Sequence, residues 1–484
     1  MKKYKNNGTK LLVLIITFVI VYFSLTSISN ATVVEGKEWI VASRHPEATK
    51  AGALMLQQGG NAFDAVVAGL AALGVVDPSM SGLGAEVFIL AYSIEDKKVI
   101  SINGGGTAPK AATIDWSVRN GGIPSNSSLL RGLIPGAFDA WITTLDKWGT
   151  MRLKDVLAHA IDLAESWVVS ENAEKILTNK GIKRKLFNFP SSKEIYYKKD
   201  GSPYLSGEIM VNKELANTMK RLVAIEQEAT VDCPCRGDNT RHQSLHFARD
   251  YFYTSTIAKE FADFCKANVG LFTYFDMASY HALIEKPAHI NYRGYDVYTC
   301  SSANQGPAEL EALNIIEKFN LNSLGNNTTQ SIHLMAEAIN LFWACCVKYL
   351  GDFNFTQVPL SGLLSKEYAE KRKALINLNQ RRSDWPYGDP FPFDQPESEY
   401  IYYGKPLPRY PDLPPVSIMY SKPFCPTVSK AVNALKDILT ETSKGVDENI
   451  LEYENSYVCA ADKWGNLVYA TSSLNSPFGT GVVI

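Results

Sequence analysis

Residues 454–484, ENSYVCAADKWGNLVYATSSLNSPFGTGVVI, predict two β-strands joined by a turn. Residues 456–461 are apolar and β-prone, and residues 467–474 are β-prone again and rich in hydroxyl groups. Between them, Asp462-Lys463-Trp464-Gly465-Asn466 carries turn residues. A glycine-rich end, Phe478-Gly479-Thr480-Gly481, follows the second strand. The stretch therefore predicts a β-hairpin near the end of the chain.

The spacing of these residues resembles the start of the small subunit in the γ-glutamyltransferase family, whose members are also called γ-glutamyltranspeptidases or glutathione hydrolases. Proteins of that family are N-terminal-nucleophile hydrolases made as one chain, which cuts itself just before a threonine. That threonine then becomes both a new N-terminus and the nucleophile. The positions that match the family pattern are Asp462, Gly465, Asn466, Thr471, Ser473, Asn475, Phe478, Gly479, Thr480 and Gly481.

The position of the family's nucleophile, seven residues before Asp462, is occupied by Asn455. The mechanism that the resemblance implies needs a hydroxyl or thiol on a residue whose freed α-amino group, with a pKa of about 7.7–8.0, serves as its base. A carboxamide is a poor nucleophile, so Asn455 is expected to block both self-cleavage and turnover. Ser456 is the alternative nucleophile. Neighbouring side chains of a strand point to opposite faces, so its hydroxyl is expected to point away from the site.

Two stretches near the N-terminus carry the same resemblance. The first, Gln58-Gly59-Gly60-Asn61-Ala62-Phe63-Asp64-Ala65, matches a family helix boundary at which Asn61 caps the next helix. Residues 63–74 are apolar on nearly all sides, so that helix is expected to be buried. The second, Ser81-Gly82-Leu83-Gly84-Ala85, precedes a predicted hairpin of strands over 86–93 and 98–102.

The loop Asn103-Gly104-Gly105-Gly106-Thr107-Ala108-Pro109 matches the part of the family that carries a substrate-binding arginine. In the γ-glutamyl-transferring branch that arginine stands at Gly105 and binds the substrate's α-carboxylate by a two-pronged contact. In the acylase-like and YwrD-like branch it stands at Thr107, and this chain has neither arginine. The resemblance further implies that Ser473 orients the nucleophile and that Asn475 holds the substrate's amino group.

The N-terminus has the pattern of a targeting segment, with four lysines in its first ten residues and an apolar run over 11–23. Residues 1–30 therefore predict either a signal peptide of a secreted protein or a type II signal anchor that leaves the bulk of the chain outside the cytoplasm. Asn-x-Ser/Thr triplets agree with an extracytoplasmic glycoprotein. Downstream of the targeting segment they lie at Asn126, Asn326, Asn327 and Asn354.

Composition excludes one class of partner and permits a large core. A net charge of −2 gives no electrostatic reason to expect nucleic acid. The chain has 484 residues, 46% of them hydrophobic, which is enough to bury a sizeable core. No cofactor is expected, and the ligand implied by the resemblance is a small γ-glutamyl or acyl-amide compound. The membrane is expected as a partner only through the N-terminal segment.

Residues 226–248 look like an insertion relative to the family and contain the candidate metal ligands Cys233, Cys235, His242 and His246. The two histidines are spaced i, i+4 and share a helix face, which is a zinc-ligand spacing, whereas the Cys-Pro-Cys pair is tighter than usual for zinc. Disulfide bonds to others of the eight cysteines are an alternative. The preferred interpretation is an unstructured surface loop with no metal.

These interpretations divide the chain into a leader at 1–30, a large-subunit-like region at 31–454 and a small-subunit-like region at 455–484. Residues 385–426 hold 11 of the 23 prolines and predict a linker. The resemblance implies a layered α/β architecture, the four-layer αββα fold of N-terminal-nucleophile hydrolases. Because only 30 residues follow position 454, the small-subunit half is expected to be truncated.

Three hypotheses for function follow. The first is a γ-glutamyltransferase homologue, ancestrally acting in glutathione hydrolysis and γ-glutamyl transfer, that is inactive because Asn455 replaces the nucleophile. The second is a catalytically inert binding or decoy protein. The third is an acylase-like amide hydrolase that uses Ser456.

Overall fold

The computed structural model describes residues 33–123, 129–232, 238–395 and 455–482. The chain divides into two units, residues 1–38 and 39–484, and every described helix and strand lies in the second. The predicted leader, Asn126, Cys233, Cys235 and most of the predicted linker therefore lie outside the described residues.

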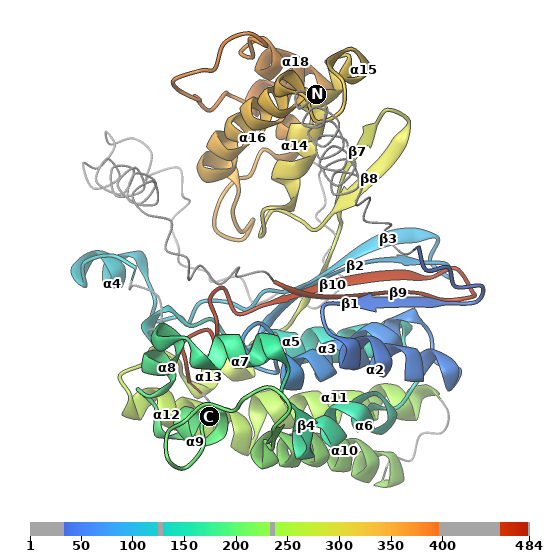
Figure 1. The fold of residues 1–484 in the computed structure, drawn as a ribbon, viewed down its shortest axis with the longest axis vertical. Helices are drawn as coiled ribbons and strands as arrows, with labels where there is room; N and C mark the ends of the chain where they lie inside the picture. Colours follow the sequence, from blue (N-terminus) through green and yellow to red (C-terminus); the bar gives the residue numbers. More distant parts are fainter. Residues whose placement is uncertain (1–32, 124–128, 233–237, 396–454, 483–484) are drawn as a thin grey trace, which may run out of the picture. The chain divides into compact units, whose positions relative to one another are not determined.

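The central element is a six-stranded antiparallel sheet with strand order β1-β9-β10-β2-β3-β6 (Figure 1). The hairpin β9–β10 inserts between the first two strands of the chain, with Ala42 opposite Cys459 and Phe88 opposite Thr471. Both predicted hairpins, β2–β3 and β9–β10, are confirmed. The strands of this sheet are β1 (Ile40–Ser43), β2 (Glu86–Ser93), β3 (Lys98–Gly104), β6 (Leu283–Glu285), β9 (Ser456–Ala461) and β10 (Leu467–Ser473).

The turn between β9 and β10 is built around the side chain of Asp462. Its Oδ1 accepts hydrogen bonds from the backbone N–H groups of Trp464, Gly465 and Asn466 at 3.0–3.1 Å. Its Oδ2 accepts a hydrogen bond of 2.9 Å from the backbone N–H of Ala62, where helix α3 (Ala62–Val76) begins. Gly465 has φ +104°, a conformation that favours glycine. The Asp-x-x-Gly-Asn spacing therefore shapes the turn and fixes it to a helix 400 residues away in sequence.

Helix α3 is buried along its whole length, as its all-round apolar sequence predicts. A capping box begins it, in which the Asn61 side chain accepts from the backbone of Asp64 at 3.2 Å and the Asp64 carboxylate accepts from the backbone of Asn61 at 2.9 Å. A Cβ atom at Gly69 would lie 2.7 Å from Val458 Cγ1 of β9. The glycine therefore permits the close packing of this helix against the terminal hairpin.

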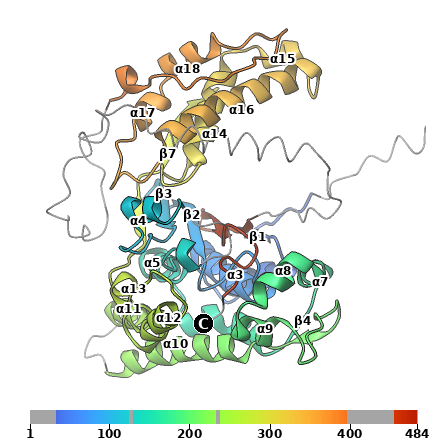
Figure 2. The ribbon, with the colours of Figure 1, turned by 90° about the vertical axis from the view of Figure 1, so that its left-hand side faces the viewer.

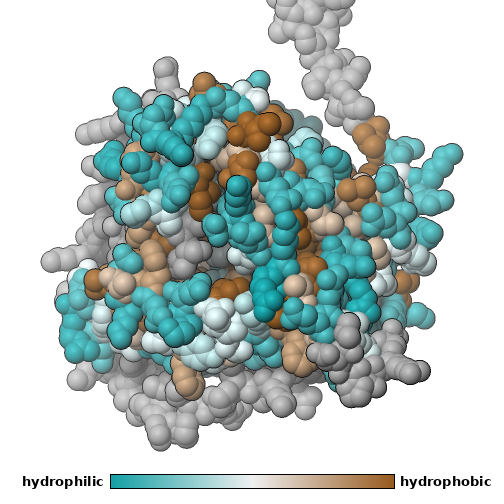
Figure 3. Space-filling model, turned by 90° about the horizontal axis from the view of Figure 1, so that it is seen from below, coloured by the Kyte–Doolittle hydropathy of each residue, from teal (hydrophilic) through white to brown (hydrophobic). Residues whose placement is uncertain are grey.

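Helices cover one face of the sheet in two successive layers (Figures 1 and 2). The layer against the sheet contains α2 (Pro46–Gln57), α3 and α5 (Ala137–Trp148), and the outer layer contains α6 (Leu153–Glu165), α10 (Lys213–Asp232) and α11 (Asp238–Thr254). Seen from below in Figure 3, hydrophilic residues cover most of the surface and hydrophobic residues are scattered, as is usual for a solvent-facing surface.

The region before residue 248 corrects one prediction. Residues 226–248 form the end of α10 and much of α11 rather than an unstructured loop, although residues 233–237 lie outside the described part. Leu222 of α10 and Leu245 and Ala248 of α11 are buried. Burial of these apolar side chains against neighbouring helices stabilises helical structure that the polar local sequence does not predict.

Residues 251–267 are helical on both sides of Ser255, because α11 ends at Thr254 and α12 (Thr256–Ala267) begins directly after that serine. The disulfide alternative was raised for Cys233 and Cys235, which lie outside the described residues. All five cysteines within the described residues are free. They are Cys265, Cys300, Cys345, Cys346 and Cys459.

The remaining elements are short helices, small hairpins and a second group of helices after residue 300. No helix within the described ranges is long and apolar enough to cross a bilayer. The described part of the predicted linker, residues 385–395, holds a single 3-10 turn. The elements not yet named are α4 (Ile114–Arg119), η1 (Leu129–Arg131), β4 (Trp167–Val168), α7 (Glu171–Thr178), α8 (Lys180–Leu186), α9 (Pro190–Tyr196), β5 (Ile209–Met210), α13 (Tyr274–Ala278), β7 (Ala288–Tyr292), β8 (Tyr295–Thr299), α14 (Gly306–Glu317), α15 (Leu321–Leu324), α16 (Thr329–Tyr349), α17 (Leu360–Leu363), α18 (Lys366–Lys373) and η2 (Phe391–Phe393).

Candidate active site

The register of the sheet brings residues that the sequence singled out into one row. Ser472 of β10 is opposite Ser456 of β9. The next pair in this antiparallel register is Ser473 opposite Asn455. Ser473 is opposite Glu86, the first residue of β2. Val87 of β2 is opposite Gly104 of β3, so the same register puts Gly105 opposite Glu86. The row therefore runs Asn455, Ser473, Glu86, Gly105, from four neighbouring strand ends.

The start of β9 presents its first two side chains to opposite sides of the sheet. Asn455 is exposed and Ser456 is fully buried, and the alternation continues with exposed Tyr457 and buried Val458. The buried side is the one on which α3 packs. The prediction that Ser456 points away from the face of Asn455 is confirmed.

The hydroxyl of Ser456 donates a hydrogen bond to the carboxylate of Asp77, which follows the last residue of α3. Asp77 also accepts a hydrogen bond from Ser79 Oγ at 2.9 Å and lies 3.5 Å from Arg44 Nε. Burial raises the pKa of Asp77, against the hydrogen bonds of Ser456 and Ser79 and the charge of Arg44, which lower it. Ser456 is therefore held by a buried carboxylate on the helical side of the sheet.

On the other side of the sheet, Ser473 is joined to two polar residues. Its hydroxyl accepts a hydrogen bond of 3.0 Å from the backbone N–H of Asn475, which has φ +64°, and Glu86 lies opposite it on the neighbouring strand. Burial raises the pKa of Glu86 to about 7, against the Ser473 hydrogen bond, which lowers it. Glu86 can therefore exchange a proton near neutral pH beside the position of the family's nucleophile.

The sequence interpretation did not include Glu86 among the site residues. Its one local signal is a carboxylate at the head of the otherwise apolar strand Glu86-Val87-Phe88-Ile89-Leu90. The proximity to Ser473 arises only from pairing between strands that lie 387 residues apart, so no local pattern reveals it.

Gly105 and Thr107, the two positions that the sequence predicts to match the arginines of the family branches, differ in their surroundings. Gly105 is buried, its N–H donates to Asn103 Oδ1 at 2.9 Å, and a Cβ atom there would lie 2.7 Å from the ring of Phe88. A larger residue at 105 would therefore require the Phe88 ring to move. Thr107 is exposed. Neither position supplies a cation for a substrate carboxylate.

A cavity of about 640 Å³ lies next to Asp77, beside the start of β9. Burial lowers the pKa of His45 in its wall, against the charges of Asp77 and Glu47, which raise it. The cavity has a mixed apolar and polar lining, which suits a small ligand with both kinds of group. The charged and hydroxyl-bearing residues that line it are Ser43, Arg44, His45, Asp77, Ser79, Ser170, Glu171, Lys175, Tyr196 and Tyr457.

Two of the four candidate metal ligands lie within the described part of the chain. His242 and His246 share one face of α11, and the structure adds Asp146 of α5 to them. The sequence could not indicate Asp146, which is 96 residues from His242.

The sequons at Asn326, Asn327 and Asn354 are exposed.

The model of the Gamma-glutamyltranspeptidase family matches residues 48–401. The chain belongs to this family. It is 29% identical to the glutathione hydrolase proenzyme of Bacillus subtilis (strain 168) over 457 residues, which cover 93% of this chain. It spans 66% of the length of that relative. It is also 31% identical to the glutathione hydrolase-like YwrD proenzyme of the same organism over 347 residues, covering 71% of this chain and 60% of that one.

Solved structures support the same fold. The structure of the Helicobacter pylori γ-glutamyltranspeptidase matches with a TM-score of 0.66 at 27% identity, covering 76% of this chain and 100% of that chain. The cephalosporin acylase of Bacillus halodurans shares the fold with a TM-score of 0.69 at 24% identity, covering 95% of this chain and 69% of that one. The family resemblance and the layered N-terminal-nucleophile hydrolase fold inferred from the sequence are confirmed. The described residues supply one large sheet of that fold with its helical layers.

Proposed function

We propose that this γ-glutamyltranspeptidase-family protein does not cut itself before residue 455 and does not turn over γ-glutamyl compounds through that position. The observation that carries the proposal is the head of β9, where the residue on the open side of the sheet is Asn455 and the adjacent hydroxyl, Ser456, is buried on the other side. A carboxamide cannot provide the alkoxide that attacks a peptide or an amide carbonyl.

Mass spectrometry of the purified protein tests this proposal. We expect the wild-type protein and Asn455→Ala to remain uncut before residue 455 after long incubation at neutral pH. We also expect neither to release glutamate from glutathione. A wild-type fragment that begins at Asn455, together with glutamate release, would overturn the proposal.

We further propose that the protein binds a small γ-glutamyl compound without converting it. Ser473 and Asn475 match the positions to which the family resemblance assigns the nucleophile-orienting and amino-binding roles. Ser473 lies in the row with Asn455, and its hydroxyl accepts from the backbone N–H of Asn475. Calorimetry with glutathione is the test, and we expect Ser473→Ala to weaken binding by roughly fivefold, the loss of one hydrogen bond worth about 1 kcal/mol. Leu467→Ala, at the exposed first residue of β10, is the control, and its affinity for glutathione should equal that of the wild-type protein.

A second candidate function is amide hydrolysis by Ser456, which one observation favours. The Asp77 carboxylate accepts the Ser456 hydroxyl proton in a hydrogen bond, and its raised pKa makes it a stronger base than an ordinary aspartate. This candidate requires cleavage between Asn455 and Ser456. A new N-terminus at Ser456, lost in Ser456→Ala, would establish it. An uncut chain that also fails to hydrolyse acyl amides would exclude it.

We propose that the protein reaches an extracytoplasmic location, either secreted or held by its N-terminal segment. The lysine-flanked apolar run supports this, and the exposure of three sequons is compatible with glycosylation. Expression in a cell with a secretory pathway, followed by glycosidase treatment, is the test. A cytoplasmic product whose migration the glycosidase leaves unchanged would contradict it.

A further inference from the structure

We propose that Asp146, His242 and His246 form a binding site for a divalent transition metal of the zinc class. Asp146 lies near the C-terminal end of α5, and the two histidines lie near the start of α11. Side-chain donor atoms of the three residues all lie within 4.8 Å of one another. Neither the row on the sheet nor the cavity beside Asp77 contributes to this cluster.

The geometry is that of a preformed three-ligand set. His242 Nδ1 contacts one carboxylate oxygen of Asp146, and His246 Nε2 lies 3.4 Å from the other. The two imidazole rings have centroids 4.6 Å apart. Zinc binds histidine nitrogen and carboxylate oxygen at about 2.0–2.2 Å, so neighbouring ligands of one ion are separated by distances of this order. A small rotation of the rings therefore admits the ion between them.

Of the three side chains, that of Asp146 is buried and those of the two histidines are partly exposed. The Asp146 side chain is 2% exposed, whereas those of His242 and His246 are 48% and 47% exposed. The carboxylate is therefore held in one place, while the imidazoles have room to turn toward a metal.

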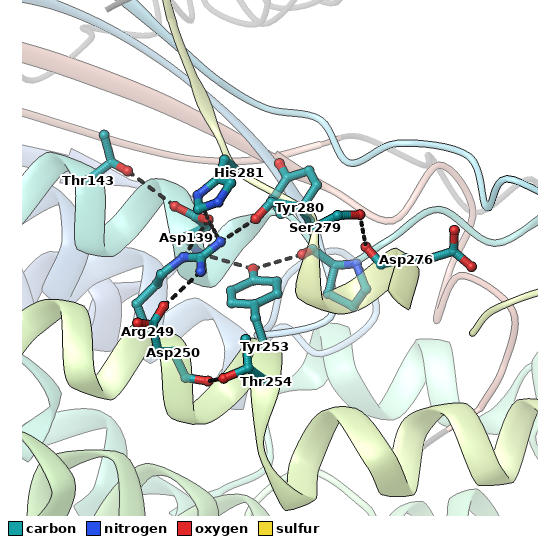
Figure 4. Close-up of polar contacts among 11 residues, drawn as sticks. Asp139, Thr143, Arg249, Asp250, Tyr253, Thr254, Asp276, Ser279, Tyr280 and His281 are labelled. Atoms are coloured by element: carbon teal, nitrogen blue, oxygen red, sulfur yellow. Dashed lines mark hydrogen bonds and ion pairs between the residues drawn. The ribbon is translucent and has the colours of Figure 1, made fainter. Parts of the chain in front are cut away.

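A second buried aspartate between α5 and α11, Asp139, has an arginine as its partner. One turn after His246, Arg249 donates two hydrogen bonds, of 2.9 and 2.8 Å, to the buried carboxylate of Asp139 (Figure 4). A guanidinium is always charged, whereas an imidazole is a full cation only when protonated. Asp146 has two imidazoles in the place of that arginine, and the half-exposed Lys147 ammonium lies 3.6 Å away. A dication would neutralise this carboxylate as Arg249 neutralises Asp139.

The ligand chemistry selects the kind of metal. Two imidazoles and one carboxylate suit zinc and its transition-metal neighbours, whereas magnesium and calcium prefer all-oxygen sites. Three protein ligands leave a coordination position for water. The bound ion would also cross-link α5 to α11, so it would stabilise the outer helical layer.

Titration of untagged, metal-stripped full-length protein with Zn²⁺ tests the site. We expect saturable binding of one ion per chain, a higher thermal midpoint with zinc, and reversal of both by a chelator. His246→Ala and His242→Ala should each weaken binding by at least about 100-fold, because loss of an outer partner alone costs about 10- to 100-fold. Asp146→Asn should do the same, with circular dichroism to show that each variant is folded.

His289→Ala is the matched control, because His289 also contacts an aspartate, Asp296, at 3.0 Å but has no second imidazole beside it. Its zinc affinity should equal that of the wild-type protein. Absence of zinc binding by the wild-type protein would overturn the proposal. Binding that persists unchanged in folded His242→Ala and His246→Ala would overturn it too, and would place the ion elsewhere.

Discussion

At the scale of single residues, the two neighbouring residues at the start of β9, Asn455 and Ser456, lie on opposite sides of the sheet. Asn455, which the sequence predicts at the family's nucleophile position, lies on the open side of the sheet with Ser473 and Glu86. Ser456 instead bonds to Asp77 on the helical side. A one-residue shift along a strand changes the face of the sheet, so the side chains of these two neighbours lie in different surroundings.

We expect Ser456→Ala to destabilise the protein by about 1–3 kcal/mol, because it leaves the buried Asp77 carboxylate with one hydrogen bond fewer. Urea unfolding at neutral pH measures the change. Tyr457→Phe, at the next and exposed position, is the control and should be within about 0.5 kcal/mol of the wild-type value. Equal stability of Ser456→Ala and the wild type would show that the contact contributes nothing.

At the scale of elements, α5 and α11 are held together by a line of polar contacts. Arg249 binds Asp139, and Tyr253 donates to the carbonyl of Pro135 at 2.8 Å. Further along, Arg241 donates to the carbonyls of Leu145 and Met151 at 2.9–3.0 Å. His242, His246, Arg249 and Tyr253 recur every three or four positions, so they form one face of α11, and Arg241 lies beside the first of them.

We expect Arg249→Met to cost about 3–5 kcal/mol of stability, because the buried Asp139 carboxylate then loses its guanidinium partner. Adding Asp139→Leu to that variant should recover a large part of the loss. Arg221→Met, which removes an exposed pair with Glu228 at 3.4 Å, is the control and should cost about 0–1 kcal/mol. Chemical denaturation provides all three values. A loss for Arg249→Met no larger than for the control would contradict the argument.

At the scale of the whole molecule, several carboxyl groups are buried with raised pKa values. Burial raises the pKa of Glu86 to about 7, of Glu285 to about 7 and of Glu311 to about 8. Glu311 lies 4.0 Å from Arg372, and its side chain is almost fully buried. A folded-state pKa above the unfolded value means that the folded protein binds the proton more tightly.

We therefore expect these groups to contribute stability that is fully present below about pH 4.5 and is lost as pH rises through about 7–8. For Glu311 the loss is on the order of a few kcal/mol at most, at 1.36 kcal/mol per pKa unit. Glu311→Gln should flatten the curve of unfolding free energy against pH in that window. Glu370→Gln, at an exposed glutamate, should leave the curve unchanged. An identical slope in Glu311→Gln and the wild type would disprove the assignment.

The amino-acid sequence by itself determined the features that depend on neighbouring residues or fixed spacings. Asp462, Gly465 and Asn466 define a turn through their own side chains and backbone, and the all-apolar residues of α3 can only be buried. The same spacings carried the family resemblance and the prediction that Asn455 stands at the nucleophile position. These features need no knowledge of distant contacts.

Only the tertiary structure decided which distant groups meet. Glu86 lies beside Ser473, Asp77 accepts from Ser456, and Asp146 joins His242 and His246, across separations of 96 to 387 residues. The helices over 226–248 likewise form because packing buries Leu222 and Leu245, which local polarity does not reveal. Pairing and burial of residues far apart in the chain depend on the folded arrangement, so a local pattern cannot encode them.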